Sequence, residues 1–251
     1  MQKNHYQRTS NLTNTQKRRK KKRRRRKFLQ FMGTIILSVL ILTAVIFGYF
    51  IIRHYRESHP DDLLDHFRFN RADIILDAGH GGKDPGAVAN DISEKDITLS
   101  ISLKTKDLLE NAGYKVAITR KEDTFLSLDD RASYANRKKA NIFVSIHCNS
   151  SEDGEGKGIE TFYSEYNEES AKNLAELIQN SIIEQTAAKD REVKTANYTV
   201  LVRTKMPSVL VETGFLTNET ERSLLSDDDY QEKIAQGITD GILKYFDTIK
   251  E

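Results

Sequence analysis

Three short runs of branched aliphatic residues in the C-terminal two thirds of the chain each lead into a polar residue. The runs read RADIILDAGHGG over residues 71–82, NIFVSIHCNS over 141–150 and PSVLVETGFLTN over 207–218. Apolar runs of this length are typical of buried parallel strands. The polar residues that follow them are His80, His147 and Glu212. Because open α/β sheets assemble their sites just beyond the carboxyl ends of the strands, we expect these three side chains to converge.

Apolar residues at helical spacing lie between and after these runs. We expect strands over residues 73–77, 114–119, 141–146, 159–163, 198–202 and 209–211, and helices over 94–112, 127–139, 168–186, 218–225 and 228–247. Ser93 is the expected N-cap of the first helix, with Asp96 three residues further on. Strands that alternate with helices of this length predict an α/β fold with helices on both faces of the sheet. Residues 73–251 contain no internal repeat, which favours one domain.

The N-terminal part of the chain follows a different pattern. An unbroken run of eleven basic residues, Lys17 to Lys27, precedes 25 uncharged residues from Phe28 to Ile52. A membrane-spanning helix needs roughly 20 apolar residues, so we expect a single transmembrane helix over 28–52. The positive-inside rule then predicts a basic cytoplasmic tail over 1–27 and, after a linker over 53–72, an exported, extracellular domain. A cleaved signal peptide is the alternative, although its apolar region would be shorter, at about 7–15 residues.

Charge separates the same two regions. Residues 1–52 carry 13 basic and no acidic residues, whereas the rest of the chain carries 26 basic and 37 acidic residues, a net charge of −11. We expect the basic tail to contact anionic lipid, because it directly precedes the apolar segment. A nucleic-acid partner is not expected for the acidic domain. The single cysteine, Cys148, excludes an intramolecular disulfide, and we expect it to be a buried core residue on the strand face opposite His147.

Two histidines and a carboxylate are the ligand set of a catalytic zinc that keeps one position open for water. Glu94, at the start of the first expected helix, adds a second carboxylate to the group, so that one glutamate is left to move protons. Each residue also has a simpler interpretation. His80 could cap a helix or contact phosphate, Glu94 could complement a helix dipole, His147 could be a strand-end histidine, and Glu212 could pair with Arg203 or Lys205. Phosphate-loop and nucleophilic-serine motifs are missing from the sequence.

Four segments strongly resemble one known family. DAGHGGKDPGA, SEKDITL, SIHCNS and PSVLVETGFLTN are similar, in order and approximate spacing, to the zinc-dependent N-acetylmuramoyl-L-alanine amidases of bacterial cell walls, the amidase type 3 family. The resemblance covers about residues 73–246. It implies a twisted mixed sheet of about six strands flanked by helices, a zinc ion held by His80, Glu94 and His147, and a catalytic role for Glu212. Two positions depart from the family pattern: Thr98 stands where many members have asparagine, and Cys148 where they have alanine or leucine.

The resemblance also implies a substrate and a reaction. Members of the family cleave peptidoglycan between the lactyl group of N-acetylmuramic acid and the L-alanine of the stem peptide. In this chain Asn149 and Arg203 are further candidates for contacting the substrate. A zinc carboxypeptidase or endopeptidase acting on the stem peptide is the nearest alternative enzyme. A catalytically silent membrane-anchored scaffold is the alternative from another class. The sequence leaves the oligomeric state open.

Overall fold

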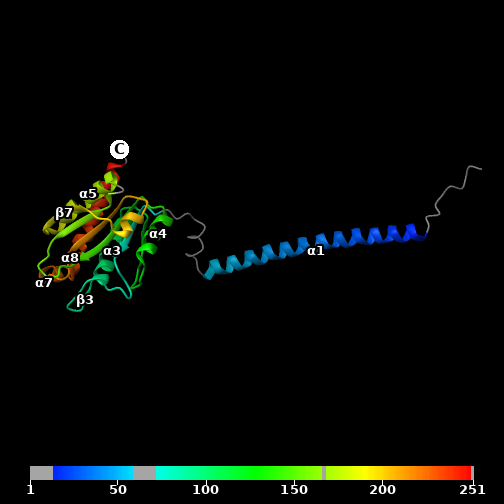
Figure 1. Cartoon of the computed structure of the whole chain (residues 1–251), viewed down its shortest axis with the longest axis horizontal. Coiled ribbons are helices and arrows are strands. Elements are labelled where there is room, and N and C mark those ends of the chain that lie inside the picture. The colour runs from blue at the N-terminus through cyan, green and yellow to red at the C-terminus, as the bar shows by residue number, and fades with distance from the viewer. Residues whose placement is uncertain (1–13, 59–71, 166–167, 250–251) are drawn as a thin grey trace, which may run out of the picture. The chain divides into compact units, whose positions relative to one another are not determined.

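The structure is a computed structural model, and it describes residues 14–58, 72–165 and 168–249. The chain divides into two compact units, Met1–Phe69 and Asn70–Glu251. The first is described by one helix and the second by a sheet with helices (Figure 1).

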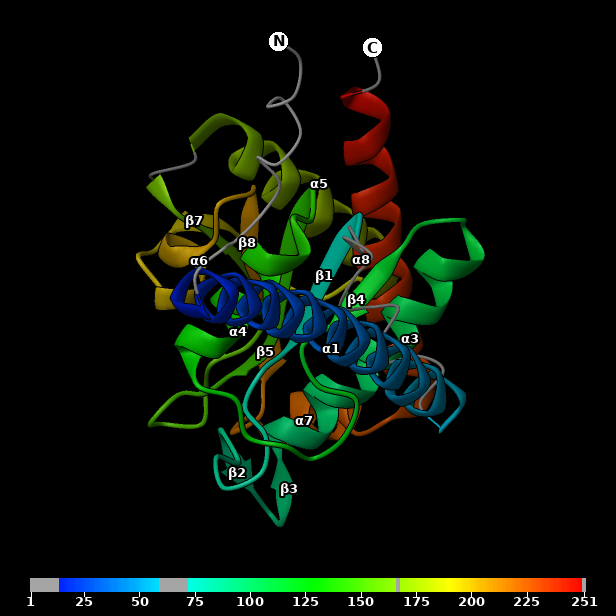
Figure 2. The same cartoon turned by 90° about the vertical axis from the view of Figure 1, so that its right-hand side faces the viewer.

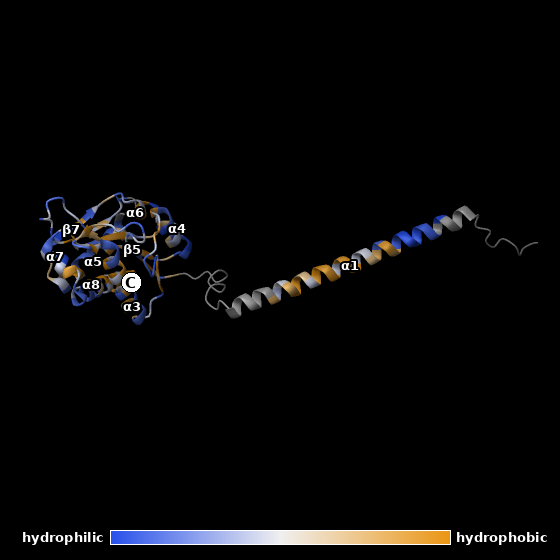
Figure 3. Cartoon of the chain, turned by 90° about the horizontal axis from the view of Figure 1, so that it is seen from below, coloured by the Kyte–Doolittle hydropathy of each residue, from blue (hydrophilic) through white to orange (hydrophobic). Residues whose placement is uncertain are grey.

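Helix α1 (Asn14–Ser58) is a single helix of 45 residues. Its first part is hydrophilic and the following part hydrophobic, as the change from blue to orange in Figure 3 shows. Within it, Lys21–Phe50 is long and apolar enough to cross a membrane, a test that a signal sequence would also pass. The helix continues to Ser58, six residues into the segment expected to be a linker. Residues 59–71 of that linker and the first 13 residues of the tail lie outside the described residues.

The second unit alternates strands and helices along the chain. Its strands are β1 (Ile74–Ala78), β2 (Val88–Ala89), β3 (Ile92–Ser93), β4 (Val116–Ile118), β5 (Ile142–Asn149), β6 (Ile159–Tyr163), β7 (Asp190–Thr195) and β8 (Ser208–Phe215). Its helices are α3 (Glu94–Asn111), α4 (Leu128–Lys138), α5 (Glu168–Thr186), α6 (Thr199–Arg203), α7 (Glu219–Leu225) and α8 (Asp228–Thr248). This order confirms the α/β class.

Six of these strands form one mixed sheet in the order β4-β1-β5-β8-β6-β7. The first four strands in this order, β4, β1, β5 and β8, are parallel to one another. Strand β6 runs antiparallel to β8, and β7 is parallel to β6. Strands β2 and β3 form a separate short hairpin that projects from the domain (Figure 2). The predicted mixed sheet of about six strands flanked by helices is therefore confirmed.

Helices cover both faces of the sheet. On one face α3, α5 and α8 bury a large apolar cluster that includes Leu76, Val144, Ile146, Val209 and Val211 of the sheet. On the other face the shorter helices α4 and α6 pack over a smaller cluster built on Ile75, Phe143 and Leu210. His147 and Glu212 project from the same face as this smaller cluster, further toward the carboxyl ends of β5 and β8, and the candidate site lies there.

Two expectations for local structure are wrong. The segment from Tyr198, expected to be a strand over 198–202, forms helix α6, whose Val200 and Leu201 pack into the smaller apolar cluster. Tertiary packing of this kind overrides the β propensity of a short segment. Strand β7 was missed, because its charged and polar residues alternate with few apolar ones. Such a composition is common in an edge strand, where charge discourages pairing with other chains. Ser93 does occupy the N-cap position of α3, but its side chain makes no capping hydrogen bond.

Candidate metal centre and active site

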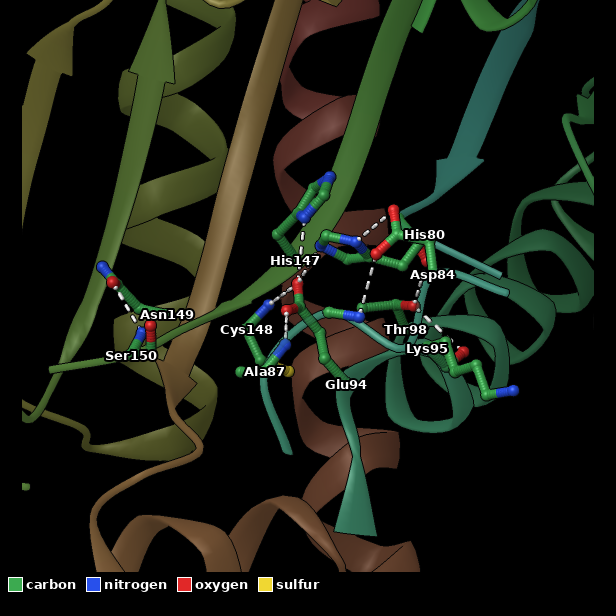
Figure 4. Close-up of polar contacts among 12 residues, drawn as sticks. His80, Asp84, Ala87, Glu94, Lys95, Thr98, His147, Cys148, Asn149 and Ser150 are labelled. Carbon is green, nitrogen blue, oxygen red and sulfur yellow. Dashed lines mark hydrogen bonds and ion pairs between the residues drawn. The ribbon is translucent and has the colours of Figure 1, made fainter. Parts of the chain in front are cut away.

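Three of the expected site residues converge at the carboxyl end of the sheet. His80 lies two residues beyond β1, Glu94 is the first residue of α3, and His147 lies in β5. Glu94 Oε1 lies 3.1 Å from His80 Nε2 and 2.9 Å from His147 Nδ1. The two imidazole rings meet edge to face, with their centroids 4.9 Å apart. In Figure 4 the two rings and the carboxylate point toward one another.

The donor atoms of these three side chains fit a metal ion. One ligand atom from each residue lies within 4.8 Å of the others. Zinc binds nitrogen and oxygen ligands at about 2.0–2.2 Å, so the ligand atoms of a tetrahedral site lie roughly 3.3 Å apart, close to the separations found here. Nitrogen donors from two histidines and one carboxylate oxygen match a catalytic zinc site with one position left open. The cluster therefore has the chemistry and spacing of a zinc site.

Further hydrogen bonds orient the ligand atoms. Nδ1 of His80 lies 2.9 Å from Oδ2 of Asp84, which leaves Nε2 facing the cluster. Glu94 Oε2 accepts a hydrogen bond from the Ala87 amide at 2.9 Å, and its Oε1 accepts one from the Cys148 amide at 3.0 Å. Such outer partners fix the tautomer and orientation of metal ligands. Asp84 belongs to the site although the sequence analysis did not select it.

Neighbouring charged groups shift the pKa values of His80 and Glu94. Burial lowers the pKa of His80, but hydrogen bonds and charge from Glu94 and Asp84 outweigh it and raise the pKa to about 9. Burial raises the pKa of Glu94, but His147 and His80 outweigh it and hold the pKa far below its usual value. Without a metal ion, His80 therefore carries a proton at neutral pH that a bound cation would displace.

The Gly-rich loop brings the backbone against the ligands. A Cβ on Gly79 would lie 2.6 Å from the His147 ring, and one on Gly86 would lie 2.4 Å from Oε2 of Glu94. Gly86 also has φ +67°, a conformation that glycine adopts without strain. His80 itself has φ 58°, which is uncommon for a residue other than glycine. The loop conformation thus depends on small residues on both sides of His80.

Two buried arginines hold this loop, and neither was selected from the sequence. The Arg120 guanidinium donates to the carbonyl oxygens of Ala78 and Gly79, at 3.1 and 2.7 Å. Arg131 donates to the His80 carbonyl oxygen at 2.6 Å and pairs with the buried Asp77 at 2.8 Å. Arg120 lies two residues after strand β4 and Arg131 follows the polar stretch Ser127–Asp130, and an arginine at either place is usually exposed, so that no local pattern marks them as buried.

Glu212 lies beside the His80/Glu94/His147 cluster, on strand β8, which pairs with the β5 strand of His147. It is the register partner of His147 across the β5–β8 pair, so the two side chains leave the same face of the sheet. Its Oε2 is buried and has no hydrogen-bond partner among the described residues. Burial raises its pKa to about 7, with the charge of His147 opposing the shift and that of Glu94 adding to it. A carboxyl group poised near neutral pH is suited to general acid–base chemistry.

Glu212 does not form the ion pair considered as its simpler interpretation. Among the described residues it makes no salt bridge, and Arg203 pairs instead with Asp129 of α4. Arg203 is exposed on α6, and its recorded contacts lie on the α4 side rather than with the cluster. Cys148 is buried in the larger apolar cluster, and burial raises its thiol pKa well above the usual range.

Asn149 and Thr98 have structural partners. The Asn149 side-chain amide donates to Glu160 of β6 at 2.6 Å, and in Figure 4 it lies apart from the histidines. Thr98 donates to the Gly79 carbonyl oxygen at 2.9 Å, which ties α3 to the Gly-rich loop. Glu160 was not selected from the sequence. A single glutamate in the apolar run IETFY was the signal that could have found it.

The sequence matches the model of one protein family, described as N-acetylmuramoyl-L-alanine amidase, over residues 74–244. The chain belongs to this family. Fold, site and match together define a hydrolase of the cell wall, a peptidoglycan N-acetylmuramoyl-L-alanine amidase.

Individual relatives support the same class. The chain is 40% identical over 174 residues to the N-acetylmuramoyl-L-alanine amidase LytC of Bacillus subtilis, covering 69% of this chain and 35% of that protein. Among solved structures, an N-acetylmuramoyl-L-alanine amidase of Clostridium difficile 630 matches with a TM-score of 0.69 and 36% identity, over 71% of this chain and 98% of that one. The catalytic domain of CwlV from Bacillus (Paenibacillus) polymyxa var. colistinus matches with a TM-score of 0.66 and 40% identity, over 69% and 97% of the two chains.

Proposed function

We propose that this chain is a zinc-dependent, membrane-anchored amidase. It hydrolyses the amide between the lactyl group of N-acetylmuramic acid and the L-alanine that begins the peptidoglycan stem peptide. The observation that carries the proposal is the convergence of His80, Glu94 and His147 beside the unpaired, buried oxygen of Glu212.

His80, Glu94 and His147 would hold the zinc ion. When bound, zinc supplies Lewis-acid chemistry that polarises a carbonyl group and makes water more acidic. Glu94 would contribute Oε1, the oxygen that lies within about 3 Å of a nitrogen of each histidine, while its Oε2 accepts the Ala87 amide. The carboxylate of Asp84 would accept the Nδ1 proton of His80 and so leave Nε2 free to hold the ion. These contacts fix the ligand geometry before substrate arrives.

Glu212 would move the protons of the reaction. Its unpaired Oε2 can accept a proton from the attacking water, since no described residue competes for that oxygen. The same oxygen then delivers a proton to the alanine nitrogen as the amide bond breaks. This delivery is needed because an amine anion is a poor leaving group.

The N-terminal helix would keep the enzyme at the cell membrane. We propose that α1 remains attached as an anchor, with residues 1–27 in the cytoplasm and the catalytic domain, residues 73–251, facing the wall. The eleven basic residues would contact anionic lipid headgroups. Retention near the membrane would then confine hydrolysis to nearby peptidoglycan.

Product analysis tests the reaction. Three samples of the full-length protein in detergent are incubated with peptidoglycan: the protein as purified, the protein after removal of metal by a chelator, and the chelated protein with zinc restored. Amidase activity releases stem peptides with a free L-alanine amino terminus and leaves glycan without peptide, in the zinc-loaded samples alone. New termini inside the stem peptide would instead show an endopeptidase or carboxypeptidase. Absence of any product with zinc present would favour the scaffold.

A further inference from the structure

A row of polar side chains runs across the sheet, from the His80/Glu94/His147 cluster to the edge strand β7. His147 of β5 is in register with Glu212 of β8, and Glu212 is in register with Glu160 of β6. Residues paired in this way project from the same face of a sheet. The row ends at Arg191 and Lys194 of β7, both of which contact Glu160. Its outer end is therefore cationic, in a domain that is acidic overall.

Glu160 is a buried carboxylate that both of these cations contact. Its side chain is 5% exposed, and both of its oxygens are occupied. Oε1 accepts a hydrogen bond from the Asn149 amide, whereas Oε2 accepts one from Arg191 Nε at 3.0 Å and one from Lys194 Nζ. Burial raises the pKa of Glu160, but Lys194 and Arg191 outweigh it and lower the pKa. One carboxylate thus faces two cations, which leaves one positive charge in excess.

The two cations remain accessible while Glu160 holds them. The Arg191 side chain is 30% exposed and that of Lys194 41%. Among the described residues, the side-chain hydrogen bond of Arg191 runs from Nε to Glu160, so its two terminal amino groups remain to donate to a ligand. The guanidinium also lies over the Phe215 ring, 4.9 Å from its centroid, which limits its motion. Two cations that Glu160 and the Phe215 ring hold in place form a preformed site for a carboxylate.

We propose that Arg191 and Lys194 bind a carboxylate on the peptide part of the substrate, one or two residues beyond the amide that is cut. Glu160 acts as a positioning residue for this pair. Both cations contact Glu160 of β6, and β6 is the neighbour of β8, which carries Glu212. Because neighbouring strands lie about 4.8 Å apart, the charged groups lie about one strand spacing from β8. An extended peptide advances roughly 3.5 Å per residue, which brings a carboxylate of the next residue or two within their reach. This proposal rests on the amidase function proposed above.

A purely structural role is the alternative. Arg191 and Lys194 could stabilise edge strand β7 through Glu160 and never touch substrate. That role would make their removal lower stability or affect every substrate equally. Recognition of a carboxylate would make the loss depend on the substrate's charge. The charge dependence separates the two.

The test compares two soluble substrates with the full-length, zinc-loaded protein in detergent. One is N-acetylmuramoyl-L-alanine extended by a residue with free carboxylates, and the other has those carboxylates converted to amides. The wild-type protein should have a kcat/KM about ten- to a hundredfold higher for the first substrate. The double variant Arg191→Gln/Lys194→Gln should lose this preference through a higher KM for the substrate with free carboxylates.

Two further variants complete the comparison. Lys172→Gln removes an exposed cation from α5, on the opposite face of the sheet, and should keep the full preference. Glu160→Gln keeps the shape of the side chain but removes the charge that holds the cations, and it should reduce the preference in the same direction. Melting temperatures measured on all variants verify that each is folded.

A binding measurement separates failure of this proposal from failure of the amidase function. The acidic peptide product should bind the wild-type protein about tenfold more tightly than the double variant, whether or not turnover occurs. Equal binding by the two proteins, or equal cleavage of both substrates by the wild type, would overturn the carboxylate site and leave the amidase function standing. An absence of amidase products alongside selective binding would do the reverse.

Discussion

Glu94, a member of the His80/Glu94/His147 cluster, and Glu212 beside it differ in what their oxygens contact. Both oxygens of Glu94 face donors in the cluster or the backbone, whereas Oε2 of Glu212 has no partner among the described residues. We expect Glu212→Gln to lower turnover by roughly 10²–10⁴-fold, the usual cost of losing general acid–base catalysis, with zinc retained. Glu94→Gln should instead release zinc. Measured zinc content and peptide release on both variants check this, and a zinc-loaded Glu212→Gln protein with normal turnover would contradict it.

The raised pKa of Glu212 predicts a pH dependence of stability in the metal-free protein. A folded-state pKa of about 7, against 4.5 for the free side chain, means that folding favours the protonated form. The stabilisation is complete below about pH 4.5 and is lost as the pH rises through 7. Glu212→Gln should therefore stabilise the chelated fragment Asn70–Glu251 by on the order of 1–3 kcal/mol at pH 8, and much less at pH 5. Urea unfolding at both pH values measures this, with the exposed Glu152→Gln as the control that should show no such difference.

At the scale of elements, the Gly-rich loop between β1 and α3 depends on close backbone approach. Gly86 and Gly113 both have positive φ, but a Cβ on Gly86 would collide with Glu94 and His80, and one on Gly113 would meet nothing within 4 Å. Alanine should cost about 1 kcal/mol of backbone strain at either position. Gly86→Ala alone should also weaken zinc binding by at least about tenfold. Zinc titration of the two variants checks this, and equal affinities would show that the loop adapts.

The elements themselves were predictable to different degrees. Strands β1, β5 and β8 were found because strands buried on both faces give continuous apolar runs. Strand β7 was missed and α6 was taken for a strand, because packing against the sheet decides the structure of such short segments. The sequence gives no sign that β6 inserts beside β8 in the antiparallel direction, since strand order depends on contacts distant in sequence.

The site was predictable where chemistry coincides with a strand end. His80, His147 and Glu212 follow apolar runs, and Glu94 opens an amphipathic helix. Arg120 and Arg131 were missed because their role is to satisfy buried carbonyl groups, which exist only once the loop has folded. Glu160 was missed for a similar reason, since its partners become neighbours through the strand order.

The whole molecule joins a basic, apolar helix to an acidic domain, and this arrangement predicts its orientation. Protease added to intact wall-less cells should degrade the domain after residue 53 and spare the tail before residue 28, because positive charge stays in the cytoplasm. Antibodies to each end would detect the two parts. Protection of the domain would contradict this topology. A mature protein that starts near residue 50 would show that the helix is a cleaved signal.

The backbone of His80 has a consequence for how the molecule balances folding against chemistry. A residue other than glycine at φ 58° costs about 1–2 kcal/mol, so the ligand position is one where the fold alone would prefer glycine. His80→Gly should therefore leave the metal-free domain more stable than His80→Ala by about 1 kcal/mol, while both lose zinc. Thermal unfolding of the chelated variants measures this difference. The histidine is thus kept at the expense of local stability, and a selection for thermostability alone would tend to discard it.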